Sequence, residues 1–67
     1  MINIKFNNET IPVRQNDSLL SILDERGFNQ AYYAVALNRG FIPRTLYEKT
    51  ILKDGDIIEV ISPMQGG

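Results

Sequence analysis

The sequence predicts an α+β fold class, in which a mixed sheet of four to five strands packs on one α-helix. Three observations predict it. Apolar and polar residues alternate near both ends of the chain, which is the period of a half-buried strand. Between these segments apolar residues recur at helical spacing, and 67 residues leave room for one domain with one small core. We therefore expect residues 1–67 to form a single domain.

The first two strands are expected to form a hairpin. Residues 1–6 and 10–14 each alternate apolar and polar side chains, and Asn7 with Asn8 suits a tight turn between them. The apolar residues of this pattern are Ile2, Ile4, Phe6, Ile11 and Val13. Because Pro12 cannot donate a backbone hydrogen bond, we place the second strand at an edge of the sheet.

One short helix is predicted in the segment NDSLLSILDERGF. Asp17 or Ser18 can cap the free amide groups at its start. Gly27 fits the left-handed position that ends a helix, after which Phe28 would pack back on Leu23. The apolar stripe of this helix comprises Leu19, Leu20, Ile22 and Leu23. Because so small a domain has few other apolar side chains to cover a sheet, we expect this stripe to lie in the core.

The second half of the chain contains three more candidate strands. Residues 32–38 are rich in strand-forming types, and Asn38 with Gly40 can form a turn into a short strand that Pro43 ends. Residues 57–61 form the most apolar strand, which suits a central position covered by the helix. The expected core residues of the domain are Ile2, Ile4, Phe6, Leu19, Leu23, Leu37, Ile58 and Val60.

The segment TLYEKTILKDGD, which precedes the last strand, is expected to be irregular. Leu46 and Ile51 are its expected apolar anchors, and Asp54 with Gly55 forms a turn before the strand. Asp54, Gly55 and Asp56 are also a candidate cation site. Two carboxylates fall well short of the roughly six to eight oxygens that calcium takes, so a plain turn is favoured.

Composition excludes several classes of function. The chain has no His and no Cys, which removes Ser-His-Asp and Cys-His nucleophilic sites, thiolate or imidazole metal sites, and disulfides. Its 7 basic and 8 acidic residues are scattered without a basic stripe, so no nucleic-acid partner is expected. No apolar run approaches the roughly 20 residues that cross a bilayer. Residues 1–7 lack the pattern of a signal peptide, so we expect a cytoplasmic location and no membrane partner.

The sequence finishes with SPMQGG, and two glycines after a strand admit two interpretations. One is a frayed end, since glycine has the most backbone freedom. The other is a reactive tail. If residues 57–61 are a central strand, residues 62–67 leave the body as a flexible arm without a charged side chain. Gly66 and Gly67 have no side chain, so only backbone and the terminal carboxylate would reach the tip of that arm.

Three segments together resemble the ThiS-type sulfur carriers, ubiquitin-like β-grasp proteins of the ThiS/MoaD superfamily. These segments are AVALNRGFIPR, LKDGDIIEVI and the terminal GG. The resemblance implies a ubiquitin-like β-grasp fold for the whole chain. It also implies the reactive tail. In such proteins a ThiF-type adenylyltransferase, similar to ubiquitin-activating enzymes, uses ATP and magnesium to adenylate the terminal carboxylate, here that of Gly67.

The same resemblance implies the later steps and their partners. A sulfur donor such as a cysteine desulfurase would serve to convert the adenylate to a thiocarboxylate. A ThiG-type thiazole synthase would then take the sulfur for thiazole formation in thiamine biosynthesis. This chain would be a protein cosubstrate, with no catalytic residue, bound cofactor or metal of its own. A channel that keeps water from the adenylate admits only a slim chain, which fits Met64, Gln65 and Gly66.

Side-chain parity predicts a docking face. If Ile58 and Val60 point toward the helix, the alternate residues of that strand point to the opposite face, beside Ala36. The candidate docking residues are Ile57, Glu59, Ile61 and Ala36. Ubiquitin-like proteins commonly dock through this face, although single exposed apolar residues are also ordinary. Arg39 and Arg44 either pair with acidic partner residues or are solvated charges.

Three alternative functions stay open. The small subunit of molybdopterin synthase has the same fold, tail and activation chemistry but a different sulfur acceptor, and the short length and GFIPR favour the thiamine carrier. A ubiquitin-like modifier would form isopeptide bonds to lysines of target proteins. A β-grasp binding module without carrier function would not need a free Gly-Gly end.

Overall fold

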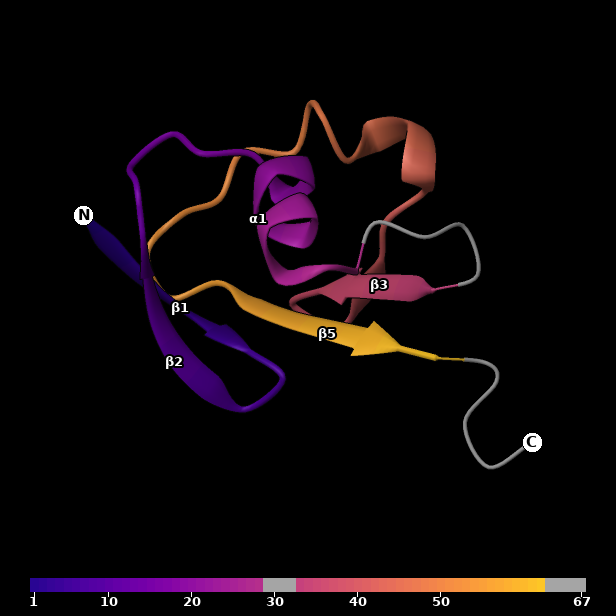
Figure 1. Cartoon of the computed structure of the whole chain (residues 1–67), viewed down its shortest axis with the longest axis horizontal. Coiled ribbons are helices and arrows are strands. Elements are labelled where there is room, and N and C mark those ends of the chain that lie inside the picture. The colour runs from indigo at the N-terminus through magenta and orange to yellow at the C-terminus, as the bar shows by residue number, and fades with distance from the viewer. Residues whose placement is uncertain (29–32, 63–67) are drawn as a thin grey trace.

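The computed structural model describes residues 1–28 and 33–62 of the chain. Figure 1 shows a twisted sheet with the helix α1 (Leu19–Arg26) lying across one face. The strands are β1 (Ile2–Phe6), β2 (Glu9–Val13), β3 (Ala34–Leu37), β4 (Gly40–Phe41) and β5 (Ile57–Ile61), in the spatial order β2-β1-β5-β3-β4. Because β5 runs parallel to β1 and antiparallel to β3, the sheet is mixed. The predicted α+β fold class is confirmed.

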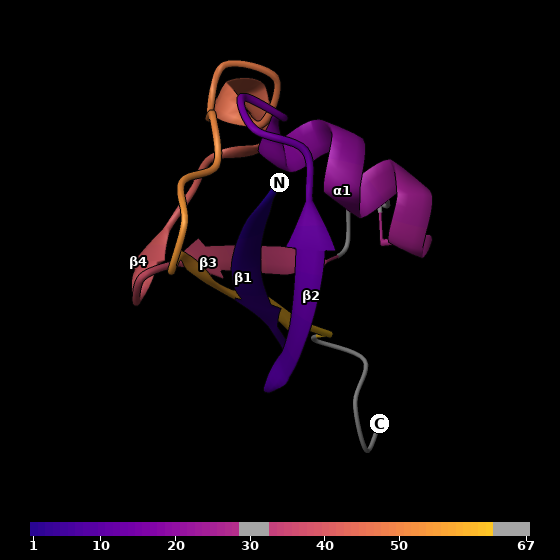
Figure 2. The same ribbon diagram turned by 90° about the vertical axis from the view of Figure 1, so that its left-hand side faces the viewer.

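The first hairpin has the predicted turn and the predicted edge. Phe6 lies opposite Glu9 in the antiparallel pair of β1 and β2, which leaves Asn7 and Asn8 as the loop. Both have positive φ, 49° and 71°, which is the signature of a type I′ turn. β2 is an edge strand of the sheet, and in Figure 2 this hairpin faces the viewer. Pro12 of β2 therefore removes no hydrogen bond between inner strands.

The helix α1 has the predicted caps. The Ser18 hydroxyl oxygen accepts a hydrogen bond from the Ser21 amide at 3.2 Å, which satisfies a free donor of the first turn. At the other end Gly27 adopts a φ of 79°, and the Phe28 amide donates to the Leu23 carbonyl at 2.8 Å. These are the backbone features of a Schellman ending. In the described ranges, no helix is long and apolar enough to cross a membrane.

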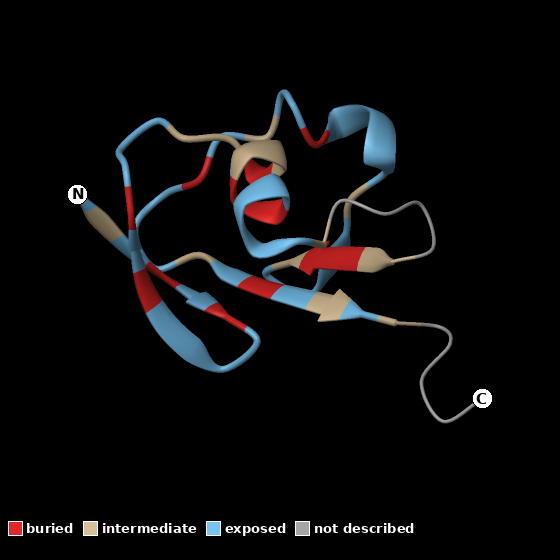
Figure 3. Cartoon of the chain, viewed as in Figure 1, coloured by how far each residue is buried: buried red, intermediate tan, exposed pale blue. Residues whose placement is uncertain are grey.

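The core lies between α1 and the sheet, and Figure 3 shows buried positions on both. Its buried apolar residues are Ile4, Phe6, Ile11, Val13, Leu19, Ile22, Leu23, Val35, Tyr47, Leu52 and Ile58. The partly buried residues packed against them are Ile2, Leu20, Phe28, Leu37, Ile42 and Val60. Every predicted core residue belongs to one of these two sets. The predicted core is therefore confirmed.

The connection from β4 to β5 differs from its prediction. It contains the 3-10 helix η1 (Arg44–Leu46), and the predicted anchors Leu46 and Ile51 are 44% and 45% exposed. The buried residues are their neighbours Tyr47 and Leu52, which are 4% and 2% exposed. The prediction is therefore wrong by one residue at both positions.

Backbone hydrogen bonds to the start of α1 explain this register. The Leu20 amide donates to the Tyr47 carbonyl at 3.1 Å, and the Leu52 amide donates to the Asp17 carbonyl at 2.8 Å. The first of these bonds satisfies an amide that the start of a helix leaves without an intrahelical partner. Together these bonds hold the connection so that the side chains of Tyr47 and Leu52 point into the core. The preceding residues, Leu46 and Ile51, are therefore exposed although they are apolar.

The turn between β3 and β4 lies where it was predicted, but a different residue takes the strained position. Leu37 pairs with Gly40, which leaves Asn38 and Arg39 as the loop, with φ of 51° and 71°. Gly40, a predicted turn residue, instead belongs to β4. A type I′ turn needs positive φ at both loop residues. Arg39 therefore holds a left-handed conformation that costs on the order of 1 kcal/mol or more.

The predicted turn before β5 is confirmed. Gly55 has a φ of 88°, and its amide donates to the Asn3 carbonyl at 2.8 Å. The Asp54 carboxylate accepts from the Asn3 amide at 2.8 Å, and the Asp56 carboxylate accepts from the Lys53 amide at 2.8 Å. Both carboxylates thus bind backbone amides of the protein itself. This arrangement ties the turn to β1 and sets the start of β5.

Candidate functional site

The strand β5 organises the candidate site, because it lies in mid-sheet between β1 and β3, as predicted. Ile61 ends the strand, Ser62 is the last described residue, and Figure 1 shows β5 pointing out of the sheet at this end. The predicted tail residues that lie outside the described part of the chain are Met64, Gln65, Gly66 and Gly67. Their roles stay predictions. The described part of the site is the end of β5 and the surface beside it.

The sheet has an outer face, which we define as the side turned away from α1. Ile58 is fully buried in the core and Val60 is half-buried, whereas Ile57, Glu59 and Ile61 are exposed. Figure 3 shows this alternation along the ribbon of β5. The predicted parity of β5 is therefore confirmed. It places two isoleucines, 41% and 47% exposed, on the outer face.

The outer face continues from β5 onto β3 and β4. Ala36 lies opposite Glu59 of β5 and opposite Phe41 of β4, so these three side chains share the face. Ala36 is only 5% exposed, whereas Phe41 is 68% exposed. Phe41 therefore supplies the accessible apolar surface that the sequence prediction gave to Ala36.

Phe41 was not among the sequence candidates, although a signal for it was present. The turn before it has two residues, and a two-residue hairpin loop fixes the register of the strands that it joins. That register pairs Phe41 with Ala36 and gives both the same parity. Once Ala36 of β3 is assigned to the outer face, its partner Phe41 of β4 is assigned to the same face.

A hollow of about 390 Å³ lies on the outer face. Its lining residues are Lys5, Asn8, Arg39, Ile57 and Glu59. Lys5 lies opposite Ile57 in the parallel pair of β1 and β5, and Arg39 comes from the turn between β3 and β4. An apolar side chain is thus accompanied by two cations and one carboxylate. Such a surface suits a partner that has an apolar centre and acidic residues beside it.

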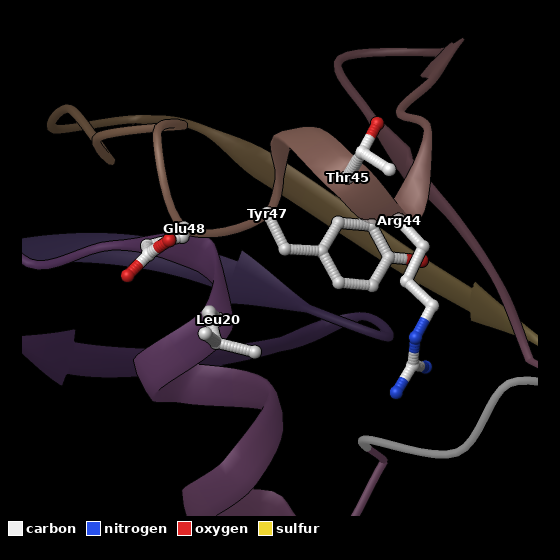
Figure 4. A pocket seen from close by; sticks show the side chains of 5 residues that line it. All are labelled: Leu20, Arg44, Thr45, Tyr47 and Glu48. Atoms are coloured by element: carbon white, nitrogen blue, oxygen red, sulfur yellow. The ribbon is translucent and has the colours of Figure 1, made fainter.

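A second hollow, of about 380 Å³, lies between α1 and the η1 segment. Its lining residues are Leu20, Arg44, Thr45, Tyr47 and Glu48 (Figure 4). Arg44 therefore lines the helix side of the molecule, whereas Arg39 lines the outer face. The two arginines that the sequence grouped as possible docking charges belong to different surfaces. Within the described ranges, no group of three or more side chains is arranged to hold a metal ion.

Comparison with known proteins gives one family. The model of the ThiS family matches residues 2–67. The uncharacterized protein ycf40 of Pyropia yezoensis is 38% identical over 66 residues, which cover 98% of this chain and 93% of that protein. The uncharacterized protein ycf40 of Porphyra purpurea is 30% identical over 66 residues, with coverage of 98% and 93%.

Two solved structures share the architecture. The crystal structure of the thiamine biosynthesis protein ThiS from Geobacter metallireducens has a TM-score of 0.83 at 29% identity and covers 98% of this chain and 100% of that one. The NMR solution structure of a thiamine biosynthesis protein from the same organism has a TM-score of 0.77 at 29% identity and covers 98% and 88%. The fold is the ubiquitin-like β-grasp that the resemblance implied.

Proposed function

The chain belongs to the ThiS family, and on this premise we propose that it is a sulfur carrier of thiamine biosynthesis that carries sulfur on its C-terminal carboxylate. The observation behind this proposal is the extent of the family match, which runs from residue 2 to residue 67 and so includes Gly66 and Gly67. The Geobacter metallireducens proteins of the same fold are named as thiamine biosynthesis proteins, which supports the same pathway.

The proposed reaction begins with activation of the Gly67 carboxylate. One carboxylate oxygen attacks the α-phosphorus of ATP, pyrophosphate leaves, and an acyl adenylate forms in the site of a ThiF-type enzyme, which holds the magnesium. A carboxylate resists nucleophilic attack because its charge is delocalised and its leaving group would be oxide. The mixed anhydride replaces that leaving group with AMP. Glycines at the tip let the carbonyl enter an enclosed site from which water is excluded.

Sulfur then replaces AMP at the same carbonyl carbon. A sulfur nucleophile at the oxidation state of hydrosulfide attacks the carbon, and the bond from that carbon to the AMP oxygen breaks. Loss of the sulfur-bound proton then leaves a thiocarboxylate. Where the donor is the persulfide of a cysteine desulfurase, its outer sulfur attacks the carbonyl carbon, AMP leaves, and an acyl disulfide forms. A thiol then attacks the desulfurase sulfur of that disulfide, so that the sulfur–sulfur bond breaks, the thiocarboxylate leaves, and the thiol and the desulfurase cysteine are joined as a new disulfide. A ThiG-type synthase takes the sulfur into the thiazole.

We place the docking of the activating enzyme on the outer face. Phe41, Ile57 and Ile61 expose apolar area there, and Lys5 and Arg39 line the hollow beside Ile57. Buried apolar anchors supply most of the energy of an interface, and charges at its rim supply orientation and association rate. The catalytic groups belong to the partners, and this chain serves them as a cosubstrate in the cytosol.

The intact mass of the protein tests the carrier function. After incubation with a ThiF-type enzyme, ATP and a sulfur donor, the full chain should gain about 16 mass units, because activation lets sulfur replace one carboxylate oxygen. A chain without Gly67 is the control and should keep its mass. An unchanged mass of the full chain, or lysine-linked conjugates in its place, contradicts the proposal. Supplying the modified chain to thiazole synthase and to the large subunit of molybdopterin synthase separates the two acceptor pathways.

A further inference from the structure

Two asparagine side chains hold the two ends of β5. The side-chain oxygen of Asn38 accepts a hydrogen bond from the Ile57 amide at 3.0 Å, and that of Asn7 accepts one from the Val60 amide at 2.9 Å. Each asparagine is the first of the two loop residues of a type I′ turn, and Asn38 and Asn7 have φ of 51° and 49°. The two hairpins lie on either side of β5 in the sheet (Figure 1). Each of them gives β5 one side-chain hydrogen bond.

The Asn7 side chain continues a ladder that the backbone of β1 cannot continue. β1 and β5 pair in parallel through Lys5 and Phe6, and the Asn7 amide donates to the Ile58 carbonyl at 3.0 Å. In a parallel ladder the next bond would join the Val60 amide to the backbone carbonyl of Asn7. Because Asn7 has left-handed φ, its backbone no longer follows the strand direction of β1. The side-chain oxygen of Asn7 accepts the bond from the Val60 amide in place of the backbone carbonyl.

This bond lies at the root of the tail, by which we mean Val60, Ile61 and Ser62. The backbone pairing of β1 with β5 ends at Ile58, so beyond that residue only β3 pairs with the strand through its backbone in the described part of the chain. A strand held on one side is freer to bend away from the sheet. The Asn7 hydrogen bond supplies a second attachment at this point.

We propose that Asn7 is a positioning residue for the tail, because its side chain fixes the direction in which the chain leaves the sheet. The inference rests on the carrier function proposed above. Once the outer face has docked, entry of the tail into the activating site is an intramolecular step that depends on how narrowly the root directs the tail. Misplacing reacting atoms by about 1 Å costs on the order of a hundredfold in rate. A looser root should therefore lower kcat for adenylation.

Three variants separate this role from general stability. Asn7→Gly keeps the left-handed backbone and removes the hydrogen-bond acceptor. Asn7→Asp keeps an oxygen acceptor on a residue type that tolerates the same backbone. Asn38→Gly is the matched control, because it removes the equivalent bond to Ile57 and a further bond to Asp56 at the far end of β5. The control thus loses more hydrogen bonds but leaves the root of the tail intact.

Amide hydrogen exchange and ATP–pyrophosphate exchange with a ThiF-type enzyme are measured on each full chain. In Asn7→Gly the Val60 amide should exchange about tenfold faster or more, because its acceptor is lost. Its kcat should fall about fivefold or more while KM stays within about twofold, because the outer face is unchanged. Asn7→Asp should restore kcat to within about twofold of wild type. Asn38→Gly should speed exchange at Ile57 and keep kcat within about twofold.

Two results overturn the positioning role and leave the carrier function in place. One is a wild-type kcat in Asn7→Gly. The other is an equal loss of kcat in Asn7→Gly and Asn38→Gly, which would mark a general effect of stability. A wild-type chain that supports no ATP–pyrophosphate exchange overturns the carrier function itself, and the positioning role with it.

Discussion

The two faces of the sheet differ in how far their apolar residues are buried. On the helix side they pack into one cluster with α1, and Leu23 and Ile58 are fully buried. On the outer face, Phe41, Ile57 and Ile61 remain exposed although the core is complete without them. A domain of 67 residues has few apolar side chains to spare. The contrast supports the proposal that one face maintains the fold and the other binds a partner.

This contrast predicts that substitutions on the two faces fail differently. A change on the helix side should lower the free energy of unfolding and reduce activity only through loss of folded protein. A change on the outer face should weaken docking while the folded state persists. The substitutions of Leu23 and Ile61 are each paired with a control that makes the same chemical change at a position where no such effect is expected.

The largest expected effect on stability is at Leu23. Leu23→Ala removes packing from a fully buried position and should lower the free energy of unfolding by about 2 to 5 kcal/mol. Leu46→Ala makes the same change at a residue that is 44% exposed and should cost less than about 0.5 kcal/mol. Urea unfolding followed by circular dichroism measures both. A loss below about 0.5 kcal/mol in Leu23→Ala would mean that α1 does not pack as described.

A smaller effect, on binding, is expected at the outer face. Ile61→Asp places a charge in the apolar surface beside the tail and should raise the Kd for the activating enzyme about tenfold or more, equivalent to about 1.4 kcal/mol. Ile51→Asp is a close control, since the two isoleucines are 47% and 45% exposed and Ile51 lies opposite Ser18 at the start of α1, away from β5. Isothermal titration measures both affinities. Equal Kd values for Ile61→Asp and wild type would remove the outer face as the docking surface.

Much of the fold can be predicted from local sequence signals. The errors of the prediction have a common cause. The period of two in β1 and the Gly27 ending of α1 act within a few residues, so both are predictable. The burial of Tyr47 and Leu52 depends on backbone bonds between the start of α1 and a segment about thirty residues later in the chain. The periodicity of a sequence carries no information on backbone bonds between distant segments. The prediction chose Leu46 and Ile51 because they are apolar, and these are the neighbours of the residues that are buried.

In the candidate site, too, some features follow from the local sequence and others depend on contacts between distant residues. The parity of β5 places Ile57 and Ile61 on the outer face from the sequence alone. The placement of Phe41 requires the register of the β3–β4 turn. The sequence prediction put Gly40 in the turn, whereas Gly40 belongs to β4. The bond from Val60 to Asn7 joins residues 53 positions apart and depends on a side chain in a turn. Only a three-dimensional structure brings those two residues together.

The smallest expected effect is at Arg39, where stability and docking should change in opposite directions. Arg39→Gly relieves the left-handed strain and should raise the free energy of unfolding by about 0.5 to 1 kcal/mol. The same change removes a cation from the outer-face hollow and should slow association with the activating enzyme most at low salt. Arg39→Lys keeps both the charge and the strain and is the control. Urea unfolding and stopped-flow association measure the two effects, and a fall in stability of Arg39→Gly would contradict the turn conformation.

The central claim is that the tail reacts while the rest of the domain presents it, and deletion of Gly67 tests this most directly. The deletion draws the carboxylate back by roughly 3.5 Å, whereas a misplacement of about 1 Å already costs on the order of a hundredfold in rate. Gly66→Val should act in the same way, because it adds a branched side chain where a narrow channel admits only backbone. The buried core cluster of the described residues runs from Ile4 to Ile58 in the chain, so we expect both variants to stay folded.

The measurement is ATP–pyrophosphate exchange with a ThiF-type enzyme, run beside a thermal melt of each variant. We expect exchange to fall about a hundredfold or more in both variants, while Tm moves by less than about 2 °C. Exchange at near the wild-type rate in the chain without Gly67 would contradict it, because the terminal glycine would then have no part in the chemistry.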